Sequence, residues 1–493
     1  MLTTNNTETS ALFTDFYSLT MAQGYWKNNR QERVVFEMFF RQQPFGGGYS
    51  IFAGLETLLD KITGYKFTNS DIEYLNSLKI FDSGFLDYLK TFCFNGTLWA
   101  MDEGTVIFPH EPLIRVEGNL IECQIIEGLL LNVINFQSLI ATKTCRIWLA
   151  SEKGSVMEFG LRRAQGFDGA ISASRAAYIG GVSSTSNTLA GKIFGIPAMG
   201  TMAHAWIMSF NSEEEAFDAY ASIYPDKTVF LIDTYDTLKS GIQNAIKIGK
   251  KLDAAGKKFG VRLDSGDIQY LSIEVRKQLD KAGLKNAFIT VSNDLDEHII
   301  ETLVKEGSPI DSWGVGTRLV TGGTAASFTG VYKLAAIHEN EKIKPVMKLS
   351  DNLEKTTNPG IKQVWRVKDE EGLAIADVLS LDDGTDDLSR GNQYCFWHQS
   401  ADYRHFFHTI EGKGSVVPLL KKRMESGKLI LDHPPLENVK KHAEINLEDF
   451  DSSYKRLLNP HVYKVSITDK LRALKLQLIE KHRCFYIDVL TSM

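Results

Sequence analysis

Six short apolar segments between residues 156 and 315 constrain the fold of this chain more than any other feature. They lie at residues 156–159, 198–200, 229–232, 260–263, 287–291 and 312–315, and segments of helical character separate them. Short strands that alternate with helices are typical of an α/β fold with a parallel sheet. We therefore predict an α/β domain over this part of the chain.

Polar or glycine residues follow each of these predicted strands. In chain order the sequences after them read GLRR, TMAH, DTYDT, DSGD, SNDLD and GTRL. The functional residues of α/β barrels lie at the C-terminal ends of the strands. The pattern therefore favours a barrel over an open, doubly wound sheet, which is the alternative.

Composition and charge exclude several classes of protein. The chain has 493 residues and a formal net charge of −6, which argues against a general binder of nucleic acid or membrane surfaces. No apolar run approaches the roughly 20 residues that span a bilayer, and the first residues do not resemble a signal peptide. The five cysteines are far apart and form no CxxC pair, so neither a disulfide framework nor structural zinc is expected. We expect a cytoplasmic protein.

Residues 158–210 hold the densest set of candidate functional residues. Two adjacent arginines, Arg162 and Arg163, precede repeated glycines and serines, and His204 follows them. Loops of glycine, serine and threonine bring backbone N–H groups close to a ligand, and arginines supply positive charge, so the segment suits a polyanion such as phosphate. A histidine beside short turn residues can act there as a base or a nucleophile.

Ten motifs in this chain resemble, in order and at plausible spacing, those of the nicotinate phosphoribosyltransferase family. One such motif alone is a weak signal, but ten in order are a strong one. They cover most of residues 10–370 and read TDFYSLTMAQGY (14–25), FEMFFRQQP (36–44), EFGLRRAQG (158–166), SNTLAG (186–191), GTMAHAW (200–206), LIDTYDT (231–237), GVRLDSGD (260–267), VSNDLDE (291–297), GVGTRLVTG (314–322) and PGIKQVWR (359–366).

The resemblance implies a type II phosphoribosyltransferase fold, in which an irregular α/β barrel is joined by a second α+β domain built from N-terminal and later segments. We expect an N-terminal domain over residues 1–135 and the barrel domain over residues 136–340. A C-terminal region over residues 341–493 is expected to pack partly on the N-terminal domain and to end in a largely helical tail. The resemblance also implies a homodimer with the active site at the subunit interface.

The implied reaction joins nicotinate to phosphoribosyl pyrophosphate and gives nicotinate mononucleotide and pyrophosphate, the first step of NAD salvage from nicotinate. ATP hydrolysis is coupled to it through a phosphorylated histidine, and Mg²⁺ is the expected cofactor. His204 matches the family's phosphohistidine, and an imidazole can attack the γ-phosphorus of ATP. Asp233 is expected to orient this imidazole, and Thr201 to offer a hydroxyl to nicotinate.

Arg262 and Asp264 alternate along one predicted strand, so their side chains share a face. Two charges inside an otherwise apolar barrel indicate function. Arg262 would bind an anion, and Asp264 would bind ribose hydroxyls or Mg²⁺, which prefers oxygen ligands. Arg162 would hold pyrophosphate, because a guanidinium can donate two parallel hydrogen bonds.

The resemblance places the pyridine ring between Phe159 and Tyr17. Asn187 matches an aspartate of nicotinamide-using relatives, and a neutral side chain there suits a carboxylate substrate. Arg41 is a candidate anion contact from the partner subunit. Two strand-end loops would cradle the ribose 5-phosphate with backbone N–H groups, and their residues are Ser292, Asn293, Gly314, Gly316 and Thr317.

Three other functions fit the sequence less well. A relative that uses nicotinamide is disfavoured by Asn187, and one that uses quinolinate by the histidine motif. A barrel lyase would need a Schiff-base lysine at a strand end, and none of the six predicted strands ends in one. A non-catalytic nucleotide sensor would not need the full set of His204, Asp233, Arg262 and Asp264.

Overall fold

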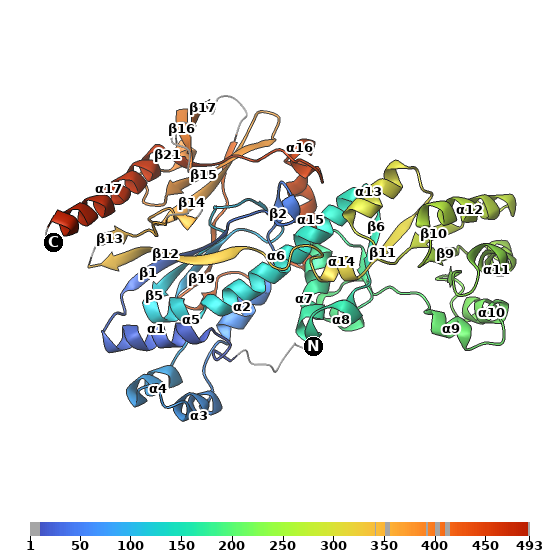
Figure 1. The fold of residues 1–493 in the computed structure, drawn as a ribbon, viewed down its shortest axis with the longest axis horizontal. Coiled ribbons are helices and arrows are strands. Elements are labelled where there is room, and N and C mark those ends of the chain that lie inside the picture. Colours follow the sequence, from blue (N-terminus) through green and yellow to red (C-terminus); the bar gives the residue numbers. More distant parts are fainter. Residues whose placement is uncertain are drawn as a thin grey trace. The chain divides into compact units, whose positions relative to one another are not determined.

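The computed structural model describes residues 10–340, 342–350, 355–390, 393–399, 405–409 and 415–491. The described chain forms two compact units (Figure 1). Ile140–Ala326 is the first, which we call the central unit because it lies in the middle of the sequence. The described residues up to Leu139 and from Ser327 onward form the second, which we call the flanking unit.

A six-stranded parallel sheet organises the central unit. All the predicted strands but one are confirmed, and the exception, residues 198–200, contributes a single bridge between Ala198 and Thr185. In spatial order the strands are β7 (Ser184–Thr185), β6 (Ser155–Glu158), β11 (Ser312–Val315), β10 (Phe288–Val291), β9 (Gly260–Leu263) and β8 (Val229–Leu231). The pairings within this unit leave β7 and β8 as its outer strands, so the α/β fold is confirmed and closure into a barrel stays a prediction.

Helices connect these strands, and side-chain caps fix where several of them begin. Asp267 accepts the backbone N–H of Tyr270 at the start of one helix, and Ser212 accepts that of Glu215 at another. Because the strands are parallel, the loops after them meet at one edge of the sheet. The helices are α7 (Gly166–Ile179), α8 (Thr188–Phe194), α9 (His204–Met208), α10 (Glu213–Ile223), α11 (Ile242–Ala254), α12 (Ile268–Lys281), α13 (Glu297–Lys305) and α14 (Thr317–Val320).

The flanking unit contains two larger sheets and a two-stranded one, β2 (Ser50–Ile51) with β4 (Val106–Ile107). The seven-stranded sheet runs, in order, β13 (Lys342–Pro345), β12 (Gly330–Glu339), β1 (Arg33–Phe40), β5 (Ile114–Asn119), β3 (Thr97–Ala100), β19 (Lys421–Glu425) and β20 (Lys428–Leu429). The six-stranded sheet runs β17 (His405–Thr409), β16 (Gln393–His398), β21 (Val465–Thr468), β15 (Ala374–Leu381), β14 (Lys362–Lys368) and β18 (Ser415–Pro418). Strand β1 is buried from its second residue onward because it pairs on both sides, with β12 and β5.

Most helices of the flanking unit come from the N-terminal part of the chain. Helix α1 spans Phe16–Lys27, and the helical stretch after β5 is divided into α5 (Leu120–Ile125) and α6 (Glu127–Ala150). Helix α6 continues past Leu139 into the central unit. The remaining helices are α2 (Leu55–Thr63), α3 (Asn69–Ser77), α4 (Ser83–Lys90), α15 (Leu436–Glu448), α16 (Ser452–Lys455) and α17 (Asp469–Thr491).

The C-terminal tail is less helical than its sequence predicts. Besides α15, α16 and α17, it contributes β18, β19, β20 and β21 to the two larger sheets. These strands are two to five residues long. Strands β18, β19 and β21 pair with β14, β3 and β15, respectively, which are distant in sequence, and β20 pairs with the adjacent β19. Segments this short show no clear alternation of apolar and polar residues, so their partners rather than their own pattern make them strands.

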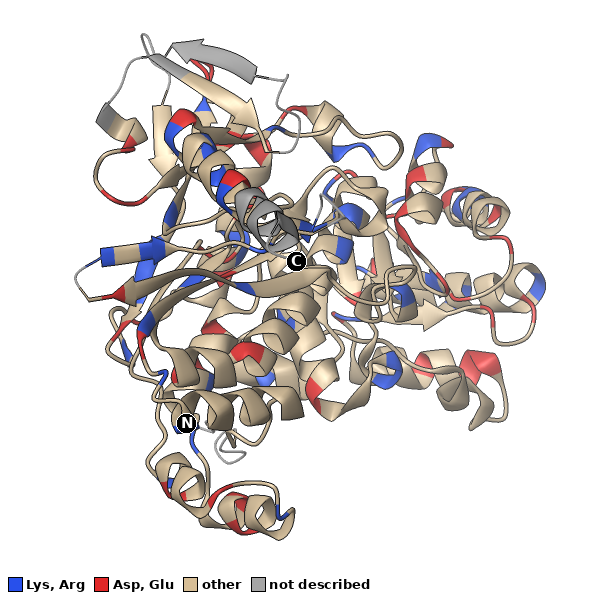
Figure 2. Ribbon diagram, turned by 60° about the vertical axis from the view of Figure 1, so that its left-hand side comes forward, with Lys and Arg blue, Asp and Glu red and all other residues tan. Residues whose placement is uncertain are grey.

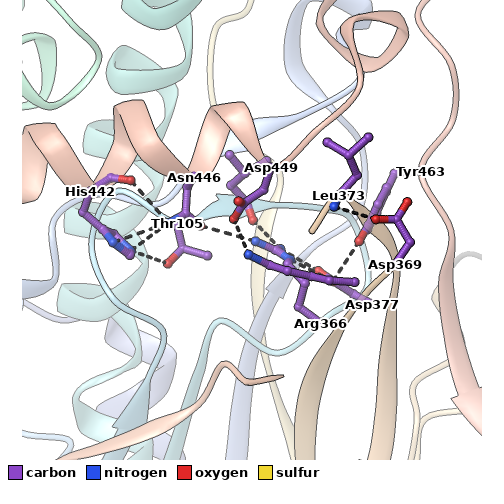
Figure 3. Close-up of polar contacts among 11 residues, drawn as sticks. Thr105, Arg366, Asp369, Leu373, Asp377, His442, Asn446, Asp449 and Tyr463 are labelled. Atoms are coloured by element: carbon purple, nitrogen blue, oxygen red, sulfur yellow. Dashed lines mark hydrogen bonds and ion pairs between the residues drawn. The ribbon is translucent and has the colours of Figure 1, made fainter. Parts of the chain in front are cut away.

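A buried ionic network connects β14 and β15 in the flanking unit (Figure 3). Arg366 donates from Nε to Oδ1 of Asp377 at 3.0 Å and from Nη2 to Oδ2 at 2.7 Å. Nη2 also reaches the carbonyl of Val106 at 2.7 Å, and the hydroxyl of Tyr463 donates to Asp377 at 3.1 Å. Although burial opposes it, Asp377 holds the pKa of Arg366 above its ordinary value. The network therefore keeps both buried charges fully paired.

Charges of both signs are distributed over the fold. Figure 2 shows lysine and arginine interspersed with aspartate and glutamate along the helices and strands of the described chain. Among the described helices, none combines the length and apolarity needed to cross a membrane.

Candidate active site

A cavity of about 580 Å³ opens in the central unit, where the loops after β6, β9, β10 and β11 meet. Most of the residues predicted to form the site line it together. These are Phe159, Arg162, Thr201, His204, Arg262, Asp264, Ser292, Asn293, Gly314, Gly316 and Thr317. The parallel sheet thus brings motifs that are far apart in sequence to one space.

His204 is the first residue of α9, and its imidazole contacts Asp233. Nε2 of His204 lies 3.3 Å from Oδ1 of Asp233, whose side chain is buried while that of His204 is 40% exposed. The other oxygen of Asp233 accepts the backbone N–H of Asp264 at 3.1 Å and the hydroxyl of Ser265 at 2.5 Å. Asp233 therefore fixes the imidazole and the β9 loop together, and Nδ1 is the ring nitrogen that Asp233 does not engage.

Arg262 connects two loops of the same cluster. Its Nη1 donates to the hydroxyl of Thr201 and to the carbonyl of Met202, the latter at 3.2 Å, and its Nη2 lies 3.5 Å from Asp264. Burial lowers the pKa of Arg262; Asp264 and Asp233 oppose this shift and Arg162 adds to it. Nε of Arg262 is buried without a hydrogen-bond partner in the described chain. A buried donor of this kind is costly unless a ligand satisfies it.

Asp264 is held in place by two neighbours and keeps one oxygen for a ligand. Its Oδ1 accepts the hydroxyl of Ser292 and faces Arg262. The hydroxyl of Ser292 is thus used within the protein, and the predicted phosphate cradle has to come from backbone groups. Oδ2 of Asp264 makes no hydrogen bond to the described residues, and its side chain is 30% exposed. This oxygen suits a ribose hydroxyl or a hard cation.

Phe159 packs against the backbone of β11 because residue 314 is glycine. A Cβ atom at Gly314 would lie 2.6 Å from Cδ2 of Phe159, closer than two carbon atoms tolerate. A Cβ at Gly316 would meet the carbonyl of Phe159 at 3.1 Å. These two glycines therefore set the position of the aromatic ring in the cavity wall, a role that the sequence alone did not reveal.

Glu158 is a positioning residue that the sequence analysis missed. It is fully buried at the end of β6, directly before Phe159. Its carboxylate accepts the N–H of Gly160, the hydroxyl of Ser174 at 2.9 Å and the hydroxyl of Thr185 at 2.5 Å. It thereby ties the loop that carries Phe159 to α7 and β7, in the way that supporting residues hold a site rigid.

Other cavity residues also escaped the predicted set. Asn293 was predicted as a site residue, but its backbone conformation was not. Its φ of 110° lies in the left-handed region, and backbone strain of this kind is concentrated at functional sites. Arg163, a candidate from the sequence beside Arg162, also lines the cavity. The additional lining residues are Ser186, Gly200, Met202, Ala203 and Asp294. All are next to predicted residues in the sequence, which was the only signal available for them.

Asn187 does not line the cavity. It is the N-cap of α8, where its side-chain oxygen accepts the N–H of Ala190 at 3.2 Å, and its Nδ2 donates to the carbonyl of Ala170 at 3.3 Å. The side chain is buried. The structure thus shows a capping role, and recognition of the pyridine substituent by Asn187 stays a prediction.

Tyr17 and Arg41 belong to the flanking unit. Burial, and then the nearby carboxylates of Glu127 and Asp15, raise the pKa of Tyr17 to about 12. Nε of Arg41 is buried without a partner among the described residues. Burial lowers the pKa of Lys333; Glu127 opposes this shift, and Arg41 and Lys348 add to it.

Three family models for nicotinate phosphoribosyltransferase match the chain. The model of the N-terminal domain matches residues 12–135, the model of the family matches residues 155–382, and the model of the C-terminal domain matches residues 361–475.

Known proteins match over nearly the whole chain. The nicotinate phosphoribosyltransferase of Bacillus subtilis (strain 168) is 40% identical over 96% of this chain and 95% of its own length. The human nicotinate phosphoribosyltransferase is 32% identical over 94% of this chain and 95% of its own length. The crystal structure of human nicotinic acid phosphoribosyltransferase gives a TM-score of 0.83 at 30% identity, covering 94% of this chain and 99% of that one. The chain therefore belongs to the nicotinate phosphoribosyltransferase family.

Proposed function

We propose that this chain transfers the phosphoribosyl group of phosphoribosyl pyrophosphate to nicotinate, the first step of NAD salvage from nicotinate. The single observation that carries the proposal is the cavity of the central unit, which Arg162, Arg163 and Arg262 line together with His204 and Asp264. The similar proteins from Bacillus subtilis and human are both named nicotinate phosphoribosyltransferase, which supports the same substrate.

The transfer itself needs placement and charge rather than a base. The pyridine nitrogen forms a bond to C1 of the ribose, while the bond from C1 to the pyrophosphate oxygen breaks and pyrophosphate leaves with the electron pair. The nitrogen carries no proton when it attacks, so no general base is required. Arg162 and Arg262 would stabilise the negative charge that develops on the leaving group, and Phe159 would hold the pyridine ring.

Mg²⁺ fits this site if the protein and the substrate coordinate the ion together. Among the described residues, no group of three or more His, Cys, Asp or Glu side chains could hold a metal ion. Magnesium, however, commonly binds through one or two carboxylates and takes its other ligands from water and phosphates. Asp264 would supply that carboxylate through Oδ2. The bound ion would neutralise part of the pyrophosphate charge.

His204 would couple ATP hydrolysis to the transfer. Because Nε2 faces Asp233, we assign Nδ1 as the nucleophile. Nδ1 forms a bond to the γ-phosphorus, the bond from that phosphorus to the β,γ-bridging oxygen breaks, and ADP leaves with the electron pair. Water later hydrolyses the N–P bond and releases phosphate. The negative phosphohistidine would change the affinity of the arginine-rich cavity for substrates and products, which is how the two reactions become linked.

The proposed active enzyme is a cytoplasmic homodimer. In this arrangement Arg41 of one subunit would contact an anion in the active site of the other. Tyr17 would cover the second face of the pyridine ring.

Incubation of the purified protein with radiolabelled nicotinate and phosphoribosyl pyrophosphate, with and without ATP, tests the proposal. We expect labelled nicotinate mononucleotide in both reactions and more of it with ATP. Nicotinamide in place of nicotinate should react poorly. Absence of labelled mononucleotide under both conditions would contradict the proposed function.

A further inference from the structure

A second cavity, of about 530 Å³, opens beside the first within the central unit. It lies between the start of α12 and the first turns of α13. Asn293 and Asp294 line both cavities, so the two share a wall. Nothing in the phosphoribosyl transfer described above makes use of this second space.

The lining of the second cavity suits a flat heterocycle. Ile268, Leu295, Ile299 and Leu303 supply an apolar surface on which a ring can lie. Polar side chains surround it, and those of Gln269 and His298 make no hydrogen bond to the described part of the chain. They can therefore pair with the ring nitrogens and amino group of a base.

The charges of the two cavities differ in sign. The first is lined by Arg162, Arg163 and Arg262, with Asp264 and the shared Asp294. The second has no lysine or arginine in its described lining and carries Asp267 besides Asp294. Phosphates are favoured in the first cavity and disfavoured in the second. Hydroxyl groups, by contrast, can donate to a carboxylate such as Asp294 at the shared wall.

A short path connects the second cavity to the histidine nucleophile. Asp233 contacts His204 and accepts the hydroxyl of Ser265. The next two residues, Gly266 and Asp267, line the second cavity. The loop that fixes the imidazole thus continues directly into the wall of the second space.

We propose that the second cavity binds the purine base of ATP, with the ribose at Asp294 and the triphosphate in the first cavity, its γ-phosphorus at His204. This inference rests on the proposed function, because it assigns a place to the ATP of that reaction. Phosphoribosyl pyrophosphate has no base and does not need this cavity. The second cavity is therefore the part of the site that distinguishes the two phosphate-bearing substrates.

Filling the second cavity tests the assignment. Ile299 is 43% exposed, so Ile299→Trp can occupy the space without disturbing the core. We expect the KM for ATP in His204 phosphorylation to rise roughly tenfold or more, a loss of about 1.4 kcal/mol per tenfold. The KM for phosphoribosyl pyrophosphate without ATP should stay within about twofold. The inhibition constant of inorganic tripolyphosphate, which has no base, should also stay unchanged.

Two further variants separate a local effect from a general one. His298→Ala removes a polar group of the second cavity and should raise the KM for ATP in the same direction. Glu301→Ala changes a residue of the same helix that pairs with Lys305 at 3.1 Å and does not line the cavity, and it should leave every constant unchanged. Matching melting temperatures would show that all three variants are folded.

The outcomes distinguish this inference from the function on which it rests. If Ile299→Trp phosphorylates His204 with the wild-type KM for ATP, the second cavity does not hold the base, and the proposed function stands. Equal rises for ATP and tripolyphosphate would also overturn the inference, because the effect would then not concern the base. If wild-type protein transfers phosphoribosyl groups but is never phosphorylated by ATP, both the ATP coupling and this inference fail together.

Discussion

Each unit contains an arginine–carboxylate ion pair, but the two pairs differ in burial and in how many of their hydrogen-bonding groups are paired. In the flanking unit Arg366 and Asp377 make two close contacts and are almost fully buried (Figure 3). In the central unit Arg262 and Asp264 are 3.5 Å apart beside a cavity, with side chains 12% and 30% exposed. The first pair is saturated with partners, whereas the second keeps hydrogen-bonding capacity for something else.

The difference shows how a structural charge can be told from a functional one. Every strong contact of Arg366 ends on the protein itself, at Asp377 and at the carbonyl of Val106. Arg262 instead has a buried Nε without a partner among the described residues. A charge buried with its counter-charge holds one conformation of the protein. A charged side chain beside a cavity that keeps a hydrogen-bond donor without an acceptor can bind an anionic ligand.

Arg366→Ala should give the largest effect on stability. It leaves Asp377 buried without its counter-charge, and loss of one partner of a buried pair costs about 3–5 kcal/mol. Chemical denaturation measures the change. Lys368→Ala is the matched control from the same strand, since its ion pair with Asp449 is partly exposed and should contribute about 1 kcal/mol or less. Equal destabilisation by both substitutions would break the comparison.

Arg262→Ala should affect binding more than folding. Removing one partner of a hydrogen-bonded charge pair with a bound anion costs roughly 2–5 kcal/mol, which would appear in the KM of an anionic substrate. The control is Arg276→Ala, because Arg276 caps the carbonyls of Ala287 and Leu284 outside the cavity. Steady-state kinetics with both substrates provides the test. An unchanged KM for nicotinate and for phosphoribosyl pyrophosphate would contradict the assignment of Arg262.

The buried network of the flanking unit also predicts a pH dependence. Burial, and then the adjacent Asp377, raise the pKa of Glu111 well above its ordinary value of 4.5. Between the two pKa values the folded protein keeps a proton that the unfolded chain releases, so this group's stability contribution is lost as pH rises. Glu111→Gln removes the titration.

Urea midpoints for wild type and Glu111→Gln between about pH 5 and pH 8 measure this effect. The free energy of unfolding of the wild type, derived from these midpoints, should fall relative to that of the variant as pH rises. The fall should be up to about 1.4 kcal/mol per pH unit. Parallel curves would show that Glu111 does not hold a proton in the folded state.

Asn187→Asp should give the smallest effect. A carboxylate near the pyridine substituent would repel nicotinate and lower its specificity constant relative to that of nicotinamide. Aspartate remains a good N-cap for α8 but loses the donation to Ala170, so stability should fall by about 1 kcal/mol. Lower stability with an unchanged ratio of specificity constants would assign Asn187 to capping alone.

The sequence predicted the parts of the site that follow from local pattern. The short apolar runs of β8 to β11 were recognisable because each is bounded by polar or glycine residues. The alternate spacing of Arg262 in β9 and Asp264 directly after it predicted that both face the same side, and both line the cavity. Motif order identified the family, and with it His204 and Asp233, whose contact the structure contains.

Contacts between distant segments were not predictable in this way. Glu158 has its hydroxyl partners 16 and 27 residues away, so no local pattern marks it as a positioning residue. Nothing in the local sequence marks Lys362 as a core residue. It is nevertheless buried 2.9 Å from Glu37 within the flanking unit. Whether a charge faces a ligand, the core or solvent depends on its tertiary neighbours.

His204→Ala provides the most direct test of the central claim, that the cavity of the central unit transfers phosphoribosyl groups and that His204 couples ATP to the transfer. Wild type and variant are incubated with γ-labelled ATP, nicotinate and phosphoribosyl pyrophosphate, and acid-labile protein phosphate and mononucleotide are measured together. We predict that the variant takes up no label and loses the ATP stimulation, yet still makes mononucleotide without ATP. Full ATP stimulation in the variant would contradict the account.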